Sequence, residues 1–174
     1  MDWHKKTGNL LSCSADRAAI VWIPDANKEL MPQMCVTKEK KSNIDASWNH
    51  RGDKFCIGTS SGYCLQATYN EQFGFWVCSD VKPRHKASVV CVRYDPGSGR
   101  VCASVSLDGT VQIKTCYDPM IDGADTNAVG PYKDIVSEKE EFLFKFNPGA
   151  WVNFFSFSPS GAAFCFGSKL FAEN

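Results

Sequence analysis

Apolar and polar positions along this chain follow the pattern of short β-strands, and the stretch 101–113 shows it most clearly. The first five residues of the stretch form an uninterrupted run of apolar and small side chains, as in a strand covered on both faces. After Asp108-Gly109, a strong tight-turn dipeptide, Val111 and Ile113 resume with a period of two. The pattern predicts a β-hairpin in which a buried strand leads into a half-buried one.

The same unit recurs along the chain. Each copy begins with a short apolar strand that ends in an aromatic residue, followed by a turn and two further strands. The closing aromatic residues are Trp3, Trp48, Tyr94 and Phe157, which are spaced by 45, 46 and 63 residues. A repeat of about 40 to 45 residues with four short strands is typical of the blades of a β-propeller.

A fourth, outer strand is expected after each third strand, at 31–36, 75–81 and 142–146. Pro32 is acceptable in the first of these because an outer strand has a free edge. The chain is therefore predicted to be all-β, an incomplete propeller of about three and a half to four blades. The approximate bounds of these blades are 1–37, 43–81, 87–146 and 150–174.

The third repeat is longer than the others because of an inserted loop at 117–141. This segment is rich in Asp, Gly, Pro and Asn, so we expect it to be solvated and mobile. Its acidic residues are Asp118, Asp122, Asp125, Asp134, Glu138, Glu140 and Glu141.

Composition narrows the class of function. Lys and Arg together number 19, as do Asp and Glu, which argues against a dedicated nucleic-acid or membrane binder and favours protein partners. No apolar run approaches the roughly 20 residues that span a bilayer, and the start lacks the apolar core of a signal peptide, so a cytosolic location is expected. Most of the nine cysteines fall within apolar strand runs, where reduced thiols act as small hydrophobic residues.

The histidines and aspartates of the sequence are not spaced as catalytic or metal-binding residues usually are. His4, His50 and His85 are isolated, without the paired spacing of zinc ligands. Asp16 and Asp108 recur in register, but equivalent turns of the first and third blades lie too far apart for joint acid–base catalysis. We therefore expect no catalytic residues, no metal and no cofactor. A cysteine-dependent hydrolase is a distant alternative.

Four positions of the repeat resemble the WD40 family. In that family a histidine before the first strand, a serine or threonine in the second, an aspartate in the turn and a tryptophan in the third form a hydrogen-bonded set that ties a blade together. The second repeat has Ser61 and Ala67 in place of the aspartate and tryptophan, so packing alone is expected to hold it. The resemblance implies a structural role for Ser12, Asp16 and Trp22 of the first repeat and for His85, Ser104 and Asp108 of the third, where Lys114 replaces the tryptophan.

A closer resemblance rests on three segments, 12–22, 71–83 and 150–158. Together they are similar to the WD40-repeat subunit 1 family of the actin-related protein 2/3 complex. The most specific part is Trp76-Val77-Cys78 followed shortly by Lys82-Pro83. Such subunits form a seven-bladed propeller, of which this chain resembles the middle. The segment between late blades that projects toward actin and nucleation-promoting partners in the family is absent from this sequence.

The resemblance implies a non-catalytic scaffold that supports actin filament nucleation and branching. Such a subunit would hold accessory subunits near the two actin-related proteins, which carry the ATP, and would reach actin indirectly. Its location would be the cytoplasm and the actin cytoskeleton. The alternative is a generic WD40 adaptor in another complex, such as the substrate receptor of a ubiquitin ligase.

Basic residues gather in loops that a propeller places on one face. These loops precede the first strand of a blade or join its second and third strands, whereas the acidic insert lies on the opposite face. The chain would then be a disc with one basic and one acidic face, and the basic face is a candidate docking surface for an acidic partner. The alternative is that these side chains are only solvated. The residues are Arg17, Lys38, Lys40, Lys41, Lys82, Arg84 and Lys86.

Overall fold

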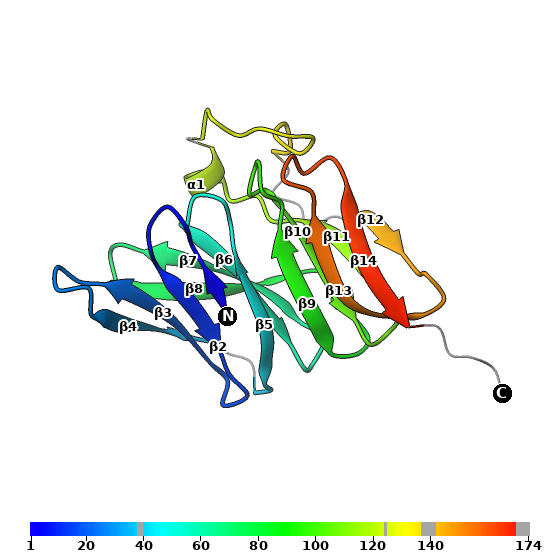
Figure 1. The fold of residues 1–174 in the computed structure, drawn as a ribbon, viewed down its shortest axis with the longest axis horizontal. Coiled ribbons are helices and arrows are strands. Elements are labelled where there is room, and N and C mark those ends of the chain that lie inside the picture. The colour runs from blue at the N-terminus through cyan, green and yellow to red at the C-terminus, as the bar shows by residue number, and fades with distance from the viewer. Residues whose placement is uncertain (38–39, 124, 137–141, 170–174) are drawn as a thin grey trace.

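The computed structural model describes residues 1–37, 40–123, 125–136 and 142–169. Its described residues form β-strands and connecting loops, with a single turn of helix (Figure 1). None of the described helical residues forms a helix long and apolar enough to cross a membrane.

The strands fall into four groups that follow the chain. The first contains β1 (Asp2–Trp3), β2 (Leu10–Cys13), β3 (Ala18–Pro24) and β4 (Leu30–Val36). The second contains β5 (Asn43–Trp48), β6 (Lys54–Thr59), β7 (Cys64–Asn70) and β8 (Phe75–Val81). The third contains β9 (Val89–Tyr94), β10 (Val101–Ser106), β11 (Val111–Thr115) and β12 (Phe142–Phe146), with the short helix α1 (Pro119–Asp122) between its last two strands. The fourth consists of β13 (Trp151–Phe157) and β14 (Phe164–Lys169).

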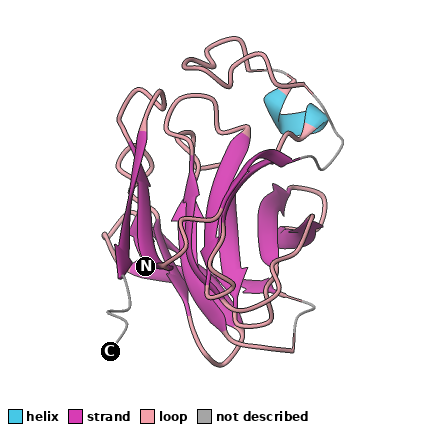
Figure 2. Ribbon diagram, turned by 90° about the vertical axis from the view of Figure 1, so that its right-hand side faces the viewer, coloured by secondary structure: helices cyan, strands magenta, loops and turns pink. Residues whose placement is uncertain are grey.

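Each group is an antiparallel meander in chain order. A single parallel bridge between Cys35 and Trp76 joins β4 to β8, so the first two groups form one eight-stranded sheet. The third group is a four-stranded sheet and the fourth a two-stranded one. The first strands β5, β9 and β13 contact one another in succession. Figure 2 shows the sheets side by side, with α1 at the upper end. This arrangement is an incomplete WD40 β-propeller, which confirms the predicted fold class.

The hairpin at 101–113 forms as predicted, with Val101 paired to Thr115 and Val105 to Val111. Gly109 has φ +78°, a conformation that glycine adopts without strain. However, β11 is fully buried rather than half-buried. On one face of β11, Val111 and Ile113 pack in the hydrophobic cluster that contains Val152 of β13. The alternate residues of β11 lie on the same face of the sheet as Cys102, whose Sγ is 3.8 Å from the Sγ of Cys64 in the second group. Neighbouring groups therefore cover both faces of β11.

The aromatic residues that close the first strands have different environments. Trp48 and Tyr94 are buried, whereas Trp3 is 54% exposed. In the second group the rings of Trp48, Phe55 and Trp76 pack together with centroids 4.8 to 5.6 Å apart. All nine cysteines are free thiols, and six are buried. Cys165, in the two-stranded fourth group, is exposed.

Most described residues of the insert are exposed or half-buried, as predicted for a solvated loop, but the insert is also anchored to the propeller through one buried residue. Asp122 is fully buried and forms an ion pair with Lys54, with 2.6 Å between Oδ2 and Nζ. Arg51 binds the other carboxylate oxygen at 2.8 Å. Arg100 donates to the carbonyl oxygens of Ile135 and Asp122, both at 3.1 Å. Glu138, Glu140 and Glu141 lie outside the described residues.

Candidate partner-binding surfaces

The third group contains the hydrogen-bonded set that the WD40 pattern predicts. His85, just before β9, lies with Nε2 2.9 Å from the Ser104 hydroxyl and Nδ1 3.1 Å from Asp108 Oδ2. A carboxylate only accepts hydrogen bonds, so Nδ1 carries the proton and Nε2 accepts from Ser104. The structure therefore brings all three residues together across β10 and its turn.

The two titratable groups of this set, His85 and Asp108, both have lowered pKa values. Burial lowers the pKa of His85 to about 4, assisted by the positive charge of Lys114. Burial by itself would raise the pKa of Asp108, but hydrogen bonds from the Thr110 hydroxyl and the Lys86 N–H outweigh this effect and lower it to about 2. At neutral pH a neutral imidazole thus donates to a carboxylate.

The first group contains only part of the same set. The Trp22 indole donates to the Ser12 hydroxyl at 2.8 Å, linking β3 to β2. Asp16 accepts the Ala18 N–H at 2.8 Å within its own turn, and the described residues include no bond from Asp16 to the other pair. The structure joins Ser12 to Trp22 and leaves Asp16 as a local turn residue.

The second group does not rely on packing alone, contrary to prediction. The Thr59 hydroxyl accepts the Tyr63 N–H at 3.1 Å and lies 3.0 Å from the Ser61 hydroxyl. A hydroxyl thus fixes the turn that the aspartate would otherwise hold. The WD40 pattern expects the turn aspartate at the position of Ser61. Thr59 lies two positions before it, so the pattern did not predict a role for Thr59.

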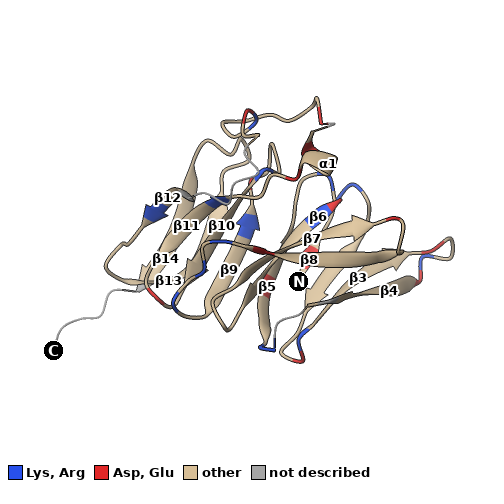
Figure 3. Ribbon diagram, turned by 180° about the vertical axis from the view of Figure 1, so that it is seen from behind, with Lys and Arg blue, Asp and Glu red and all other residues tan. Residues whose placement is uncertain are grey.

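The predicted basic residues lie in neighbouring loops at one end of the strands. Backbone hydrogen bonds hold the connections before β5 and β9 against the turns after β6 and β10, as in Ser60 N–H to Ser42 O at 2.9 Å and Leu107 N–H to Ser88 O at 2.9 Å. Lysine and arginine segments are visible below β5 in Figure 3, while α1 lies at the opposite edge. The exposed members are Arg17, Lys40, Lys41, Lys82, Arg84 and Lys86, and Lys38 lies outside the described residues.

These basic residues are not equivalent. Arg84 pairs with Asp80, with 2.7 Å between Nη2 and Oδ2, and its guanidinium lies 3.8 Å from the ring centroid of Tyr63. Lys41 and Lys86 extend into solvent. The basic end thus combines exposed lysines with an arginine that an ion pair holds in place.

At the opposite end, part of the acidic charge of the insert is paired with basic residues. Arg51 forms ion pairs with Asp53, Asp122 and Asp125, and Lys54 neutralises Asp122 further. The positive charge of the propeller turns thus compensates two of the described carboxylates of the insert, Asp122 and Asp125. The described residues thus show partial neutralisation at the end where an acidic face is expected.

Sequence reasoning missed the residues that anchor the insert. Lys54 and Asp122 are separated by 68 positions, and no local pattern distinguishes Asp122 from its acidic neighbours. Among the described residues, no group of three or more His, Cys, Asp or Glu side chains is arranged to hold a metal ion.

Comparisons with known proteins find similarity to components of two protein complexes. No model of a known protein family matches the chain. Actin-related protein 2/3 complex subunit 1A of Arabidopsis thaliana is 24% identical over 92% of this chain and 42% of the plant protein. Actin-related protein 2/3 complex subunit 1 of Saccharomyces cerevisiae is 23% identical over 72% of this chain and 32% of the yeast protein. Elongator complex protein 2 of Schizosaccharomyces pombe is 25% identical over 84% of this chain and 23% of its own length.

The chain thus spans less than half the length of these relatives. Homologues named subunit 1 of the actin-related protein 2/3 complex match most of this chain, at 20 to 24% identity. They support the resemblance seen in the sequence.

Proposed function

We propose that this chain is a non-catalytic scaffold subunit of the actin-related protein 2/3 complex that supports actin filament nucleation and branching. The observation that carries the proposal is the similarity to subunit 1 proteins of a plant and of yeasts over most of the chain. Its partners are the other subunits and the actin-related proteins, with actin reached indirectly. It acts in the cytoplasm, at the actin cytoskeleton.

The fold suits such a role because several blades of hydrogen-bonded strands form a rigid platform with projecting loops. In this proposal the exposed residues at the basic end dock an acidic surface of a neighbouring subunit. Rim charges of this kind increase the association rate and select the partner, and they are sensitive to salt. The buried residues of the blade ties keep the loops in place and do not touch the partner.

Charge reversal at the basic end tests the docking. Lys41→Glu combined with Lys86→Glu reverses two exposed positive charges. We expect binding to purified complex that lacks its own subunit 1 to weaken by about tenfold at low salt. The measurement is biolayer interferometry at two salt concentrations. Lys133→Glu, an exposed lysine in the insert, is the matched control and should leave binding unchanged. Equal affinity and equal salt dependence in the double variant and the native chain would contradict docking through this end.

A second candidate function is a generic WD40 adaptor in another assembly. The similarity to Elongator complex protein 2 over 84% of this chain favours it specifically. An adaptor of the ubiquitin-ligase type belongs to the same class. Identifying the proteins that co-purify with the chain distinguishes the two candidate functions.

A further inference from the structure

Two cysteines face each other where the outer strands of the first two groups meet. The Sγ atoms of Cys35 in β4 and Cys78 in β8 lie 3.0 Å apart, and both residues are free thiols. The bridge between Cys35 and Trp76 places the two strands side by side, and Cys78, two residues after Trp76, points to the same side of β8. A small rotation of either side chain therefore brings the two sulfurs within bonding distance.

The two thiols differ in their access to solvent. Cys35 is fully buried in the hydrophobic cluster that the first two groups share, whereas Cys78 is half-buried and packs against the same cluster. The hydrogen bond with Cys78, together with burial, raises the pKa of Cys35, so this thiol keeps its proton. A small reagent dissolved in water thus reaches Cys78 first.

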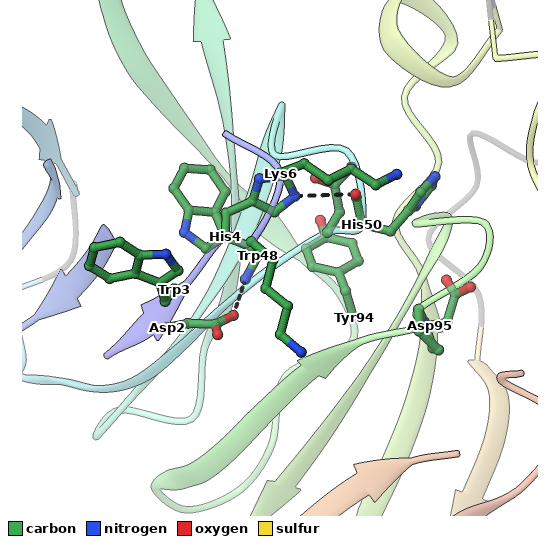
Figure 4. Close-up of a pocket in the computed structure, with 11 residues that line it drawn as sticks. Asp2, Trp3, His4, Lys6, Trp48, His50, Tyr94 and Asp95 are labelled. Carbon is green, nitrogen blue, oxygen red and sulfur yellow. Dashed lines mark hydrogen bonds between the residues drawn. The ribbon is translucent and has the colours of Figure 1, made fainter. Parts of the chain in front are cut away.

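The first two groups are joined differently at their first and outer strands. At the first strands, Asp2 accepts the N–H of Trp48 at 2.8 Å, and His4 Nε2 lies 3.2 Å from the carbonyl oxygen of His50 (Figure 4). At the outer strands, the backbone pairing of β4 with β8 is the single bridge at Cys35. A bond between the two cysteines would add a covalent link at this outer junction.

A second close pair of thiols lacks this access. Cys64 of β7 and Cys102 of β10 have their Sγ atoms 3.8 Å apart, but both side chains are fully buried between the second and third groups. A dissolved reagent does not reach either sulfur while the chain is folded. This pair is therefore an internal control for the effect of exposure.

We propose that Cys35 and Cys78 form a reversible oxidation site, at which a small-molecule disulfide such as oxidised glutathione produces a bond between β4 and β8. The Cys78 thiol releases its proton to water, and its thiolate attacks one sulfur of the reagent and breaks the reagent's S–S bond. The departing thiolate takes up a proton from water, and a mixed disulfide remains on Cys78. The Cys35 sulfur then attacks the Cys78 sulfur, and the second thiolate of the reagent leaves with the Cys35 proton.

The two steps balance in electrons and protons. The two protein thiols lose two electrons and two protons, and the reagent gains them and becomes two thiols. Disulfides in a reducing cytosol are usually transient, so excess thiol would return the pair to its reduced form. This site requires neither the basic end nor a partner protein, so it can fail without affecting the proposed function.

Mass spectrometry of the full chain after incubation with oxidised glutathione tests the proposal. The reaction is quenched with acid, the chain is unfolded and the remaining free thiols are alkylated. Digestion with trypsin and chymotrypsin together, without reduction, then separates Cys78 from the other cysteines. We expect two peptides linked through Cys35 and Cys78, which dithiothreitol releases. A link between Cys64 and Cys102 in place of this one, or recovery of Cys35 and Cys78 as free thiols, would overturn the proposal.

Matched variants assign the two roles. Cys35→Ser removes the second attacking thiol and should leave a glutathione adduct on Cys78 that is about tenfold more abundant than in the native chain. Cys78→Ser should show neither the link nor an adduct on Cys35.

The control is Cys13→Ser, which removes another half-buried cysteine that packs against the same cluster and should leave the link unchanged. Circular dichroism verifies that the variants are folded. An adduct on Cys35 in Cys78→Ser, or an equal loss of the link in Cys13→Ser, would contradict the assigned roles.

Discussion

Lys54 and Lys114 are both fully buried, yet their surroundings differ. Lys54, the first residue of β6, donates to Asp122 at 2.6 Å and to the Cys116 carbonyl at 3.0 Å. Lys114, in β11, has no hydrogen-bond partner for its Nζ among the described residues. One amine is the anchor of the insert, and the other occupies the place where the WD40 pattern has a tryptophan.

The difference shows how a partner determines the energetic effect of a buried charge. Removing an ammonium group from water costs several kcal/mol, and only a well-placed carboxylate with further hydrogen bonds offsets this. Asp122 supplies such a partner and is itself held by Arg51 and by the Asp118 N–H at 2.7 Å. Lys114 lacks this compensation. We infer that Lys54 stabilises the packing of the insert, whereas Lys114 lowers the stability of the third blade.

Breaking the paired lysine should have the largest effect. Asp122→Ala leaves Lys54 buried without its carboxylate, and we expect a loss of about 3–5 kcal/mol in the free energy of unfolding. Urea denaturation followed by circular dichroism measures it. Limited proteolysis should also cleave the 117–136 segment faster. The matched control, Lys54→Met with Asp122→Leu, removes both charges and should lose less than Asp122→Ala alone. An equal or larger loss in the double variant would contradict the explanation by an unpaired charge.

The second-largest effect on stability is expected from His85. Its pKa is lowered from 6.5 to about 4 by burial and by the Lys114 charge. The unfolded chain takes up a proton at this site at higher pH than the folded chain. Stability should therefore fall as the pH decreases from 6.5 to 4, with a slope of at most about 1.4 kcal/mol per pH unit from this group. Denaturation at several pH values measures the slope.

His85→Gln should reduce that slope because it removes the titrating ring. Burial also lowers the pKa of His50, which contributes a slope of the same sign, so the part due to His85 is the difference between the native chain and the variant. Parallel pH profiles for the two would show that His85 does not titrate with a lowered pKa.

The smallest effect is expected at the unpartnered lysine. Lys114→Met replaces the amine by an apolar side chain of similar volume and should stabilise the fold by about 1–2 kcal/mol. It should also raise the pKa of His85, since a nearby positive charge is removed, and NMR titration of the ring detects this. Lys86→Met on the surface should change stability by less than about 0.5 kcal/mol. A destabilised Lys114→Met would contradict the contrast between the two lysines.

Much of the fold was predictable because its signals are local. Alternating apolar positions and the Asp108-Gly109 turn identify the hairpin, and the recurring closing aromatic residues identify the blades. The contacts of His85 with Ser104 and Asp108 were implied by the resemblance to the WD40 family. Each of these features repeats within one blade, so short stretches of sequence contain it.

The features that sequence reasoning missed depend on residues far apart in the chain. The burial of Lys114 reflects the neighbouring sheets on both sides of β11, which an alternating pattern within one strand does not show. The anchoring of Asp122 requires Lys54 from an earlier blade.

The most direct test of the proposed function is affinity purification of the tagged chain from cells, followed by mass spectrometry. If this propeller arc is a scaffold of the actin-related protein 2/3 complex, the two actin-related proteins and the accessory subunits should co-purify with it in near-equal amounts. Recovery of Elongator or cullin-type partners without actin-related proteins, or recovery of no partner, would contradict the proposal.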